Sequence, residues 1–226
     1  MKNLIIFGTG KIAEVVHYYA KEECGFNVVC FTVDKEFIKT DNFLGLPVVP
    51  FEEVENNFPP SENLFFVAVG YHDLNKVREL KCAEAKNKGY ELTSVISPNA
   101  NVPKNVKTGV NCFIMPPALV HPFVTLGNNV FVFSGAVVAH HSHLKDNCWI
   151  TSGCNISGNV TIGENCFLAI NATIAHSVSI GKDCFIGANA LIIKNLEDEK
   201  VCFAESTKPI KLTSRQFLKM SNFSNL

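Results

Sequence analysis

Three histidines in one short stretch carry the clearest chemical signal of the sequence. They are His140, His141 and His143, in the run Val138-Ala139-His140-His141-Ser142-His143. Histidine exchanges a proton near neutral pH, which makes it the side chain most often used as a general base. It is also a common ligand of zinc. The cluster predicts proton transfer or metal binding, and the elements that hold it decide between the two.

The cluster lies within a repeat of six residues. From residue 96 to 192 every sixth residue is aliphatic except Thr108, in the series Ile96, Val102, Thr108, Ile114, Val120, Leu126, Val132, Val138, Leu144, Ile150, Ile156, Ile162, Leu168, Ile174, Ile180, Ile186, Ile192. A second series, four residues further on, consists mostly of small residues. A period of six fits neither an α-helix nor the alternation of an ordinary strand. It predicts a β-helix in which three short strands make one turn and each sixth residue points into the core.

This period places a histidine directly beneath a glycine. Three hexads form one turn, so residue n lies about 4.8 Å below residue n+18, the usual spacing between strands. His140 then lies below Gly158, and Gly158 lies below His176. Because glycine has no side chain, its N–H can approach a reacting carbonyl oxygen closely and stabilise the charge that develops there. The column combines a base with an oxyanion donor.

The nine cysteines favour a packing role. Five of them, Cys112, Cys148, Cys154, Cys166 and Cys184, fall in the small inward series of the hexads, and none forms a C-x-x-C pair. Free cysteine packs as a small hydrophobic residue. We expect these thiols to fill the core, as suits a reducing compartment.

Length, charge and hydropathy exclude several classes of protein. The 226 residues are enough for two modest domains, and the net charge of −1 indicates no face for nucleic acid. The apolar run Leu4 to Phe7 is too short for a signal peptide, and no stretch reaches the roughly 18 apolar residues of a membrane span. We expect a cytoplasmic protein with no membrane span.

The first 95 residues lack the six-residue repeat of the hexads. Short apolar runs at 4–7, 28–33, 46–49 and 64–69 predict strands, and helices are expected over 11–23 and 73–88. This alternation is typical of a small parallel α/β domain. The expected organisation is an α/β domain at 1–95, the β-helix at 96–196 and a tail at 197–226, of which Ser214 to Met220 is expected to be helical.

A nucleotide-binding turn follows the first predicted strand. Gly8-x-Gly10-x-x-Ala13 lets the backbone approach a phosphate at a helix N-terminus, although any tight turn between strand and helix can select glycine. Asp34, at the end of the second strand, is placed to bond a ribose or base. The domain is about half the size of a complete dinucleotide fold. It therefore favours a mononucleotide, or a sugar attached to one.

An α/β domain followed by hexads resembles the bacterial nucleotide-sugar acetyltransferases, over nearly the whole chain. These include amino-sugar N-acetyltransferases of glycan biosynthesis and sialic acid O-acetyltransferases. The resemblance rests on Gly8-Thr9-Gly10, Asp34, Gly45-Leu46-Pro47-Val48, the segment from Val67 to Arg78, and the hexads. It implies a left-handed β-helix, a homotrimer with active sites between subunits, acetyl-CoA along the β-helix, and a nucleotide-activated amino-sugar on the N-terminal domain.

The resemblance also implies a role for individual residues. It places the general base at His140 and the oxyanion donor at Gly158, with Gly8, Gly10 and Asp34 holding the nucleotide-sugar. Acetyl-CoA-binding positions match Gly158, Ile170, His176 and Ala188. The expected reaction is direct attack of a sugar amine on acetyl-CoA. The alternatives are a sugar O-acetyltransferase of the sialic acid type and a non-catalytic nucleotide-sugar-binding scaffold.

One position departs from these relatives. They commonly carry Glu or Asp directly after the base, whereas this chain has His141. A second imidazole can fix the tautomer of the first but brings no negative charge. Either Asp146 or another subunit supplies a carboxylate, or the base works less strongly.

A metal site is the competing interpretation of the histidines. Some hexapeptide β-helices are metal-dependent carbonic anhydrases, and the distance along the chain between His140 and His176 resembles the spacing of two of their ligands. The third ligand, expected five residues beyond His176, would be Gly181. Two histidines cannot complete a three-ligand zinc site, so no metal is expected.

Overall fold

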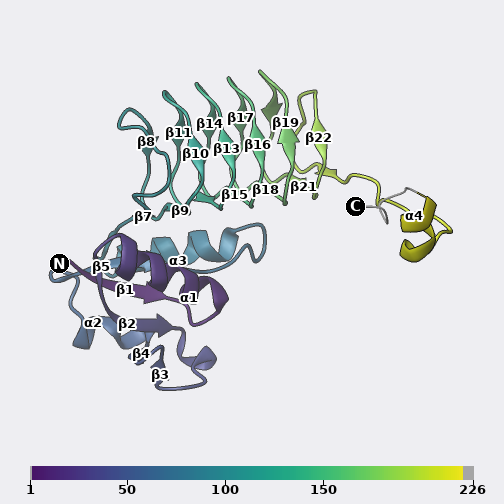
Figure 1. Cartoon of the computed structure of the whole chain (residues 1–226). Coiled ribbons are helices and arrows are strands. Elements are labelled where there is room, and N and C mark those ends of the chain that lie inside the picture. Colours follow the sequence, from purple (N-terminus) through teal and green to yellow (C-terminus); the bar gives the residue numbers. More distant parts are fainter. Residues whose placement is uncertain (1, 221–226) are drawn as a thin grey trace.

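The structure, a computed structural model, describes residues 2–220 of the chain. An α/β part, made of strands β1–β6 with helices α1–α3, lies along one side of a parallel β-helix that begins at β7 (Figure 1). A tail leads away from the far end of the β-helix to helix α4. The end of the expected tail, 221–226, lies outside the described residues.

The α/β part is built on one six-stranded sheet, which is parallel except for the pair β3–β4. In spatial order the strands are β3 (Asn42–Phe43), β4 (Leu46–Pro50), β2 (Asn27–Val33), β1 (Asn3–Phe7), β5 (Asn63–Val67) and β6 (Glu91–Leu92). The order reverses at β1, which pairs with β2 on one side and β5 on the other. Such a switch point is where open parallel sheets bind ligands, beyond the carboxyl ends of the strands.

The helices differ in detail from the predicted ones. The first expected helix is an α-helix, α1 (Lys11–Tyr18), that continues as a π-helix over Tyr19–Glu23. The second, α3 (Lys76–Asn87), starts later than the expected residue 73, because Asp73, Leu74 and Asn75 all have positive φ. The remaining helical elements are 3₁₀ turns at Lys35–Phe37 and Phe51–Glu53, α2 (Val54–Asn57) and α4 (Ser214–Met220), the last as predicted.

Strand β1 is apolar from Leu4 to Phe7 because both of its faces are covered there. Leu4 and Ile6 belong to one core cluster, which includes α1, whereas Ile5 and Phe7 belong to a second cluster, which includes α3. A strand buried on both faces reads as a continuous apolar run. None of the helices among the described residues is long and apolar enough to cross a membrane.

The β-helix has three flat faces, each a parallel sheet of two-residue strands. The first face contains β7 (Val95–Ile96), β9 (Phe113–Ile114), β12 (Phe131–Val132), β15 (Trp149–Ile150), β18 (Phe167–Leu168), β21 (Phe185–Ile186) and β23 (Val201–Cys202). The second contains β10 (Leu119–Val120), β13 (Val137–Val138), β16 (Asn155–Ile156), β19 (Thr173–Ile174) and β22 (Leu191–Ile192). The third contains β8 (Lys107–Thr108), β11 (Thr125–Leu126), β14 (His143–Leu144), β17 (Thr161–Ile162) and β20 (Ser179–Ile180).

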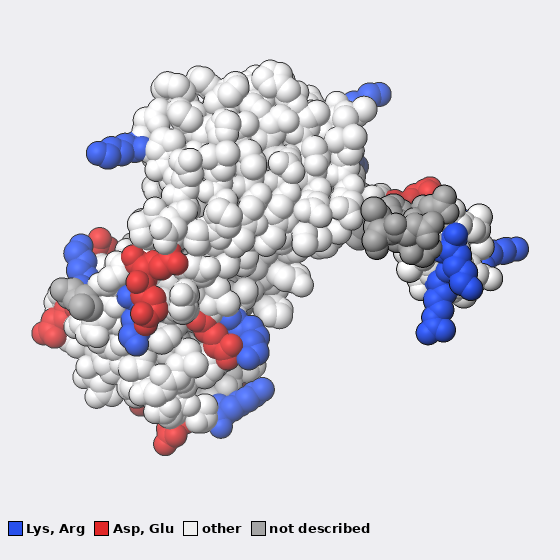
Figure 2. All heavy atoms as spheres, in the orientation of Figure 1, with Lys and Arg blue, Asp and Glu red and all other residues white. Residues whose placement is uncertain are grey.

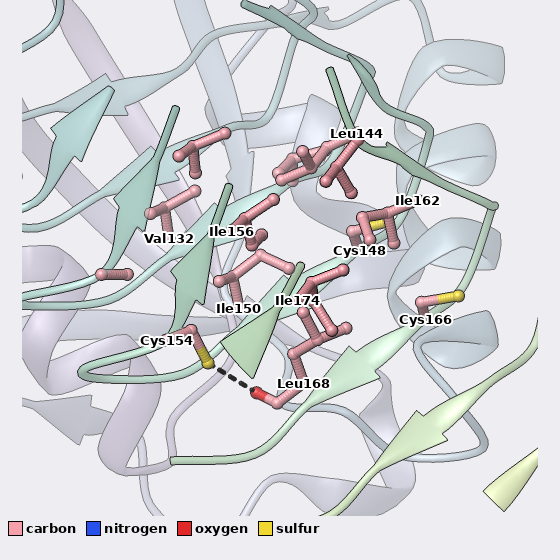
Figure 3. Packing of buried hydrophobic residues seen from close by; sticks show 14 of the residues in the cluster. Val132, Leu144, Cys148, Ile150, Cys154, Ile156, Ile162, Cys166, Leu168 and Ile174 are labelled. Carbon is pink, nitrogen blue, oxygen red and sulfur yellow. Dashed lines mark hydrogen bonds between the residues drawn. The ribbon is translucent and has the colours of Figure 1, made fainter. Parts of the chain in front are cut away.

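The strand registers confirm that three hexads make one turn, as predicted. Val137 pairs with Asn155, and Asn155 pairs with Thr173. Nearly all aliphatic hexad residues lie in one buried cluster inside the prism, and Thr108, the exception in the series, is exposed (Figure 3).

The cysteines of the hexads fill the core, as predicted. Cys148 is fully buried and its Sγ donates to the carbonyl of Gly163 at 3.1 Å, while Cys154 lies near the carbonyl of Leu168 (Figure 3). Burial raises the pKa of Cys148 to about 12 and that of Cys112 to about 11. Since the thiolate is the nucleophilic form, these groups are structural.

A row of aromatic side chains joins the β-helix to the α/β part. On the outer side of the first face, one aromatic residue recurs in each turn, at Phe113, Phe131, Trp149, Phe167, Phe185 and Phe203. The first four are buried, and they share a core cluster with Phe66 of β5 and with α1. Phe131 stacks against both Phe66 and Trp149. The two parts therefore share one hydrophobic core.

A buried arginine reinforces this junction. Arg78 of α3 is 0 % exposed, and its guanidinium donates to Asn129 Oδ1 at 2.9 Å and to the Asn147 carbonyl at 3.3 Å. It also lies 4.4 Å from the centre of the Phe131 ring. Among the described residues no carboxylate pairs with it, so amide oxygens and aromatic faces alone compensate its charge.

Candidate active site

The predicted histidine column lies at one edge of the prism. We define the second corner as the turns that lead from the second face to the third, at residues 139–142, 157–160 and 175–178. Asn159 N–H donates to the His140 carbonyl at 2.9 Å, and Ser177 N–H donates to the Gly158 carbonyl at 3.1 Å. These bonds stack His140, Gly158 and His176 in successive turns, as the spacing predicted.

The imidazole of His140 lies against the position where Gly158 lacks a side chain. A Cβ added to Gly158 would come within 2.7 Å of Cε1 and 2.9 Å of Nε2 of His140. Gly158 is buried, and within the described part of the chain its N–H donates to no protein acceptor. Buried N–H groups without a partner are rare in proteins. This one can donate to an oxygen of a ligand held beside His140.

His141 contacts His140 directly. The two Nδ1 atoms are 3.2 Å apart, so one nitrogen donates a hydrogen bond to the other. If His140 donates, its Nε2 carries a free lone pair and can accept a proton. Asp146, the alternative orienting group, lies at a different corner, between the third and first faces, where its carboxylate accepts two hydrogen bonds from Asn128. Within one chain, the neighbour that can orient His140 is His141.

Phe123 is a member of this corner that the sequence analysis missed. It lies one turn of the β-helix before His141, and the two rings stack at 4.8 Å with an interplanar angle of 28°. The same spacing that connected His140 with Gly158 could have found it. Two other histidines of the sequence lie apart from this stack: His143 is exposed on β14, and His121 begins the turn that contains Phe123.

The predicted acetyl-CoA contacts fall at two corners. His176 is exposed in the second corner, above Gly158. Ile170 and Ala188 are exposed in turns between the first and second faces, one above the other in a single column. The structure thus groups Gly158 with His176, and Ile170 with Ala188.

The predicted nucleotide-sugar residues lie at the carboxyl edge of the sheet. Gly8 has a φ of +122°, and a Cβ there would come within 2.8 Å of the Ala68 carbonyl oxygen, so the fold itself requires glycine. Gly10 caps α1 without any side-chain hydrogen bond and has open space around it. The start of α1 is therefore able to receive an anion.

Asp34 is already engaged in an ion pair. Its Oδ1 accepts a hydrogen bond from Lys81 Nζ at 2.7 Å, beside a cavity of about 460 Å³ that Phe51 and Glu84 also line. Burial lowers the pKa of Lys81, but the hydrogen bonds from Lys81 to Asp34 and Glu84 outweigh it and raise the pKa overall. The second oxygen of Asp34 is the one that could bind a hydroxyl.

Across residues 2–220, no group of three or more His, Cys, Asp or Glu side chains is arranged to hold a metal ion. His140 and His176 are two turns of the β-helix apart, with Gly158 between them. The column presents one imidazole, that of His140, beside the bare backbone of Gly158.

The chain is similar to known acetyltransferases. Residues 159–194 match the family model "Bacterial transferase hexapeptide (six repeats)". The acetyltransferase domain of PglB from Neisseria gonorrhoeae FA1090 has 26 % identity and a TM-score of 0.81, over 93 % of this chain and 100 % of that one. A structure of the same domain in complex with acetyl coenzyme A has 25 % identity and a TM-score of 0.81, over 92 % and 99 % of the two chains.

A perosamine N-acetyltransferase is equally similar. The enzyme from Caulobacter crescentus, solved as a histidine-to-asparagine mutant in complex with CoA and GDP-perosamine, has 26 % identity and a TM-score of 0.81, over 89 % of this chain and 93 % of that one. No curated protein sequence matches the chain significantly. The predicted fold is confirmed: an α/β part followed by a left-handed β-helix of hexapeptide repeats, as in acetyltransferases.

Proposed function

We propose that this protein transfers the acetyl group of acetyl-CoA to the amine of a nucleotide-linked amino-sugar. The observation that carries the proposal is the placement of His140 against the bare backbone of Gly158, in a fold with a TM-score of 0.81 to a perosamine N-acetyltransferase. That enzyme was solved with CoA and GDP-perosamine, which indicates the two classes of substrate.

The residues of the second corner supply the chemistry. His140 Nε2 accepts a proton from the sugar amine as the amine attacks the thioester carbonyl, and the free N–H of Gly158 stabilises the resulting oxyanion. Such a donor typically contributes about 3 kcal/mol to lowering the barrier, and a general base contributes about 10²- to 10⁴-fold in rate. His141 accepts the hydrogen bond from His140 Nδ1 and so keeps the lone pair of Nε2 toward the substrate. When the oxyanion collapses, the C–S bond breaks, and the CoA sulfur leaves as a thiol after it takes up the proton that His140 accepted.

The two parts of the chain divide the substrates between them. We propose that residues 1–95 bind the nucleotide-sugar, with its phosphates at Gly8 and Gly10 and its ribose or base at Asp34. Residues 96–196 bind acetyl-CoA along the column from Gly158 to His176. The last strand of the β-helix is β23 (Val201–Cys202), within the segment 197–226 that we expected to be a tail, and the exposed chain beyond it leads away from the β-helix.

Two corners of the β-helix become one binding site if subunits associate. Ile170 and Ala188 lie at a different corner from Gly158 and His176, so one acetyl-CoA contacts both sets when two copies pack side by side. The outward residues of the second face carry no charge: Leu119, Val137, Asn155, Thr173 and Leu191. On the side of the molecule drawn in Figure 2, most of the charged side chains lie on the α/β part and the tail, and few project from the β-helix. These features support a homotrimer with its active sites between subunits.

The test is release of free thiol from acetyl-CoA against a panel of 3-amino and 4-amino nucleotide-sugars. Turnover with one of them, lost in His140→Ala, is expected. Turnover only with hydroxyl acceptors would replace the proposal with a sugar O-acetyltransferase. Failure to bind CoA at all would leave a nucleotide-sugar-binding scaffold.

A further inference from the structure

Two aromatic residues depart from a rule that nearly all other left-handed positions of the β-helix follow. Outside glycine, positive φ is tolerated best by short polar residues, which bond their own backbone. The β-helix turns use Asn, Asp or Ser at such positions, namely Asn111, Asn129, Asn147, Asn159, Asn165, Asn171, Ser177, Asp183 and Asn189. The exceptions are Phe123, with a φ of 67°, His141, with a φ of 59°, and Glu199, with a φ of 61°, in the last turn before β23. Phe123, a bulky residue, is an outlier in this region, in which histidine is more common.

Core packing does not account for Phe123. Its side chain is 58 % exposed, so the strained conformation is not compensated by burial. Its ring instead stacks on the imidazole of His141 at 4.8 Å. His141 in turn contacts His140 through the two Nδ1 atoms at 3.2 Å. Phe123 and His141 therefore form a chain of contacts that ends at the proposed base, His140.

The proton balance of the reaction explains why such a ring would be useful. When His140 Nε2 takes the proton of the acceptor, the His140–His141 pair gains one positive charge. If the proton on His140 Nδ1 moves to His141 Nδ1, that charge resides on the His141 imidazolium, and His140 is neutral again. A cation within about 6 Å of an aromatic face is stabilised by the ring quadrupole. The family resemblance implies a carboxylate after the base, whereas here the next residue is His141, which stacks on the ring of Phe123.

We propose that Phe123 is a positioning residue for catalysis, which holds the His141 ring and stabilises the positive charge that the His140–His141 pair acquires. The proposal rests on the proposed acetyl transfer. Phe123 touches neither substrate nor reacting atom in this scheme, and it acts through His141.

The test compares Phe123→Leu, Phe123→Tyr, Phe123→Trp and Phe123→Asn in the full-length protein. Loss of the aromatic face in the Leu and Asn variants should lower kcat by about three- to tenfold, with KM for both substrates unchanged. Tyr and Trp keep an aromatic face and should remain within about twofold of wild type. The Asn variant should be slower and also more stable, with Tm higher by about 2–4 °C, because Asn tolerates positive φ. Phe203→Leu, at another exposed aromatic residue, is the matched control and should change nothing.

A second readout does not depend on turnover. Long-range ¹H–¹⁵N spectra report which nitrogen of each imidazole carries its proton. We expect His140 protonated at Nδ1 and His141 at Nε2 in the wild type, and a mixture of tautomers in Phe123→Leu. Unchanged kcat in the Leu and Asn variants overturns the proposal. If the wild type turns over no acceptor, the proposed acetyl transfer is wrong. The role of Phe123 is then tested by the spectra alone, and identical tautomers in the wild type and in Phe123→Leu overturn it.

Discussion

Substitution of Gly158 by alanine tests the geometry of the candidate site most directly. Gly158 has no positive φ, so its backbone accepts alanine without strain. The new methyl group would lie 2.7 Å from His140 Cε1 and 2.9 Å from Nε2, whereas ordinary carbon contacts are about 3.5–4.0 Å. The imidazole must therefore move by roughly 1 Å. His140 is exposed, so its ring can swing toward solvent at little cost in folding stability.

This displacement has a predictable effect on catalysis. A misplacement of about 1 Å in a reacting group can cost about 10²-fold in rate, which corresponds to about 2.7 kcal/mol in the barrier. The Gly158 N–H is retained, so the loss comes from the base alone. We expect kcat for thiol release from acetyl-CoA, at saturating acceptor, to fall by about 100-fold, with Tm within about 3 °C of wild type.

A double-mutant cycle with His140→Ala separates the clash from other causes. In the His140→Ala background there is no ring to displace, so adding Gly158→Ala should cost almost nothing further. If Gly158→Ala lowers kcat equally in both backgrounds, its effect does not pass through His140. A loss smaller than about threefold in the single variant would refute the placement of the base.

Three further predictions concern stability, each read from chemical or thermal denaturation. Arg78→Lys should lower the free energy of unfolding by about 3–5 kcal/mol, because lysine cannot donate hydrogen bonds to all of the buried oxygens around the guanidinium. Arg215→Lys, on the exposed helix α4, should leave the free energy of unfolding unchanged. Gly8→Ala should lower the free energy of unfolding by about 1–3 kcal/mol, because the new methyl group clashes with Ala68. Gly10→Ala has open space around it and should change this free energy by less than about 0.5 kcal/mol, so equal effects of the two substitutions would contradict the prediction. Burial raises the pKa of the core thiols, that of Cys148 to about 12, while the unfolded chain ionises them above about pH 8.5. The contribution of these thiols to the free energy of unfolding is complete below about pH 8.5 and is lost as the pH rises toward 12, by about 1.4 kcal/mol per pH unit for each thiol. An equal free energy of unfolding at pH 8 and pH 10 would refute this prediction.

The β-helix and the histidine column could be predicted from the sequence because a repeat is a local property. Each hexad sets the direction of its own side chains, and every third hexad returns the chain to the same corner. The inward aliphatic residues, the core cysteines and the stacking of His140 beneath Gly158 all follow from this periodicity. Four strands of the α/β part, β1, β2, β4 and β5, were predicted from their apolar runs, whereas β3 and β6, of two residues each, were not.

Contacts between distant segments were decided by tertiary structure alone. In the sequence Arg78 is indistinguishable from an exposed charged residue of a helix. Only the packing of α3 on the β-helix places it among Asn129, Asn147 and Phe131. The ion pair of Asp34 with Lys81 likewise joins residues far apart in the chain. A spacing of residues determines where a side chain stands on its own element, but not which side chain from another element faces it. The physical reason is that burial and hydrogen bonding between separate elements are settled only when both have folded and packed together.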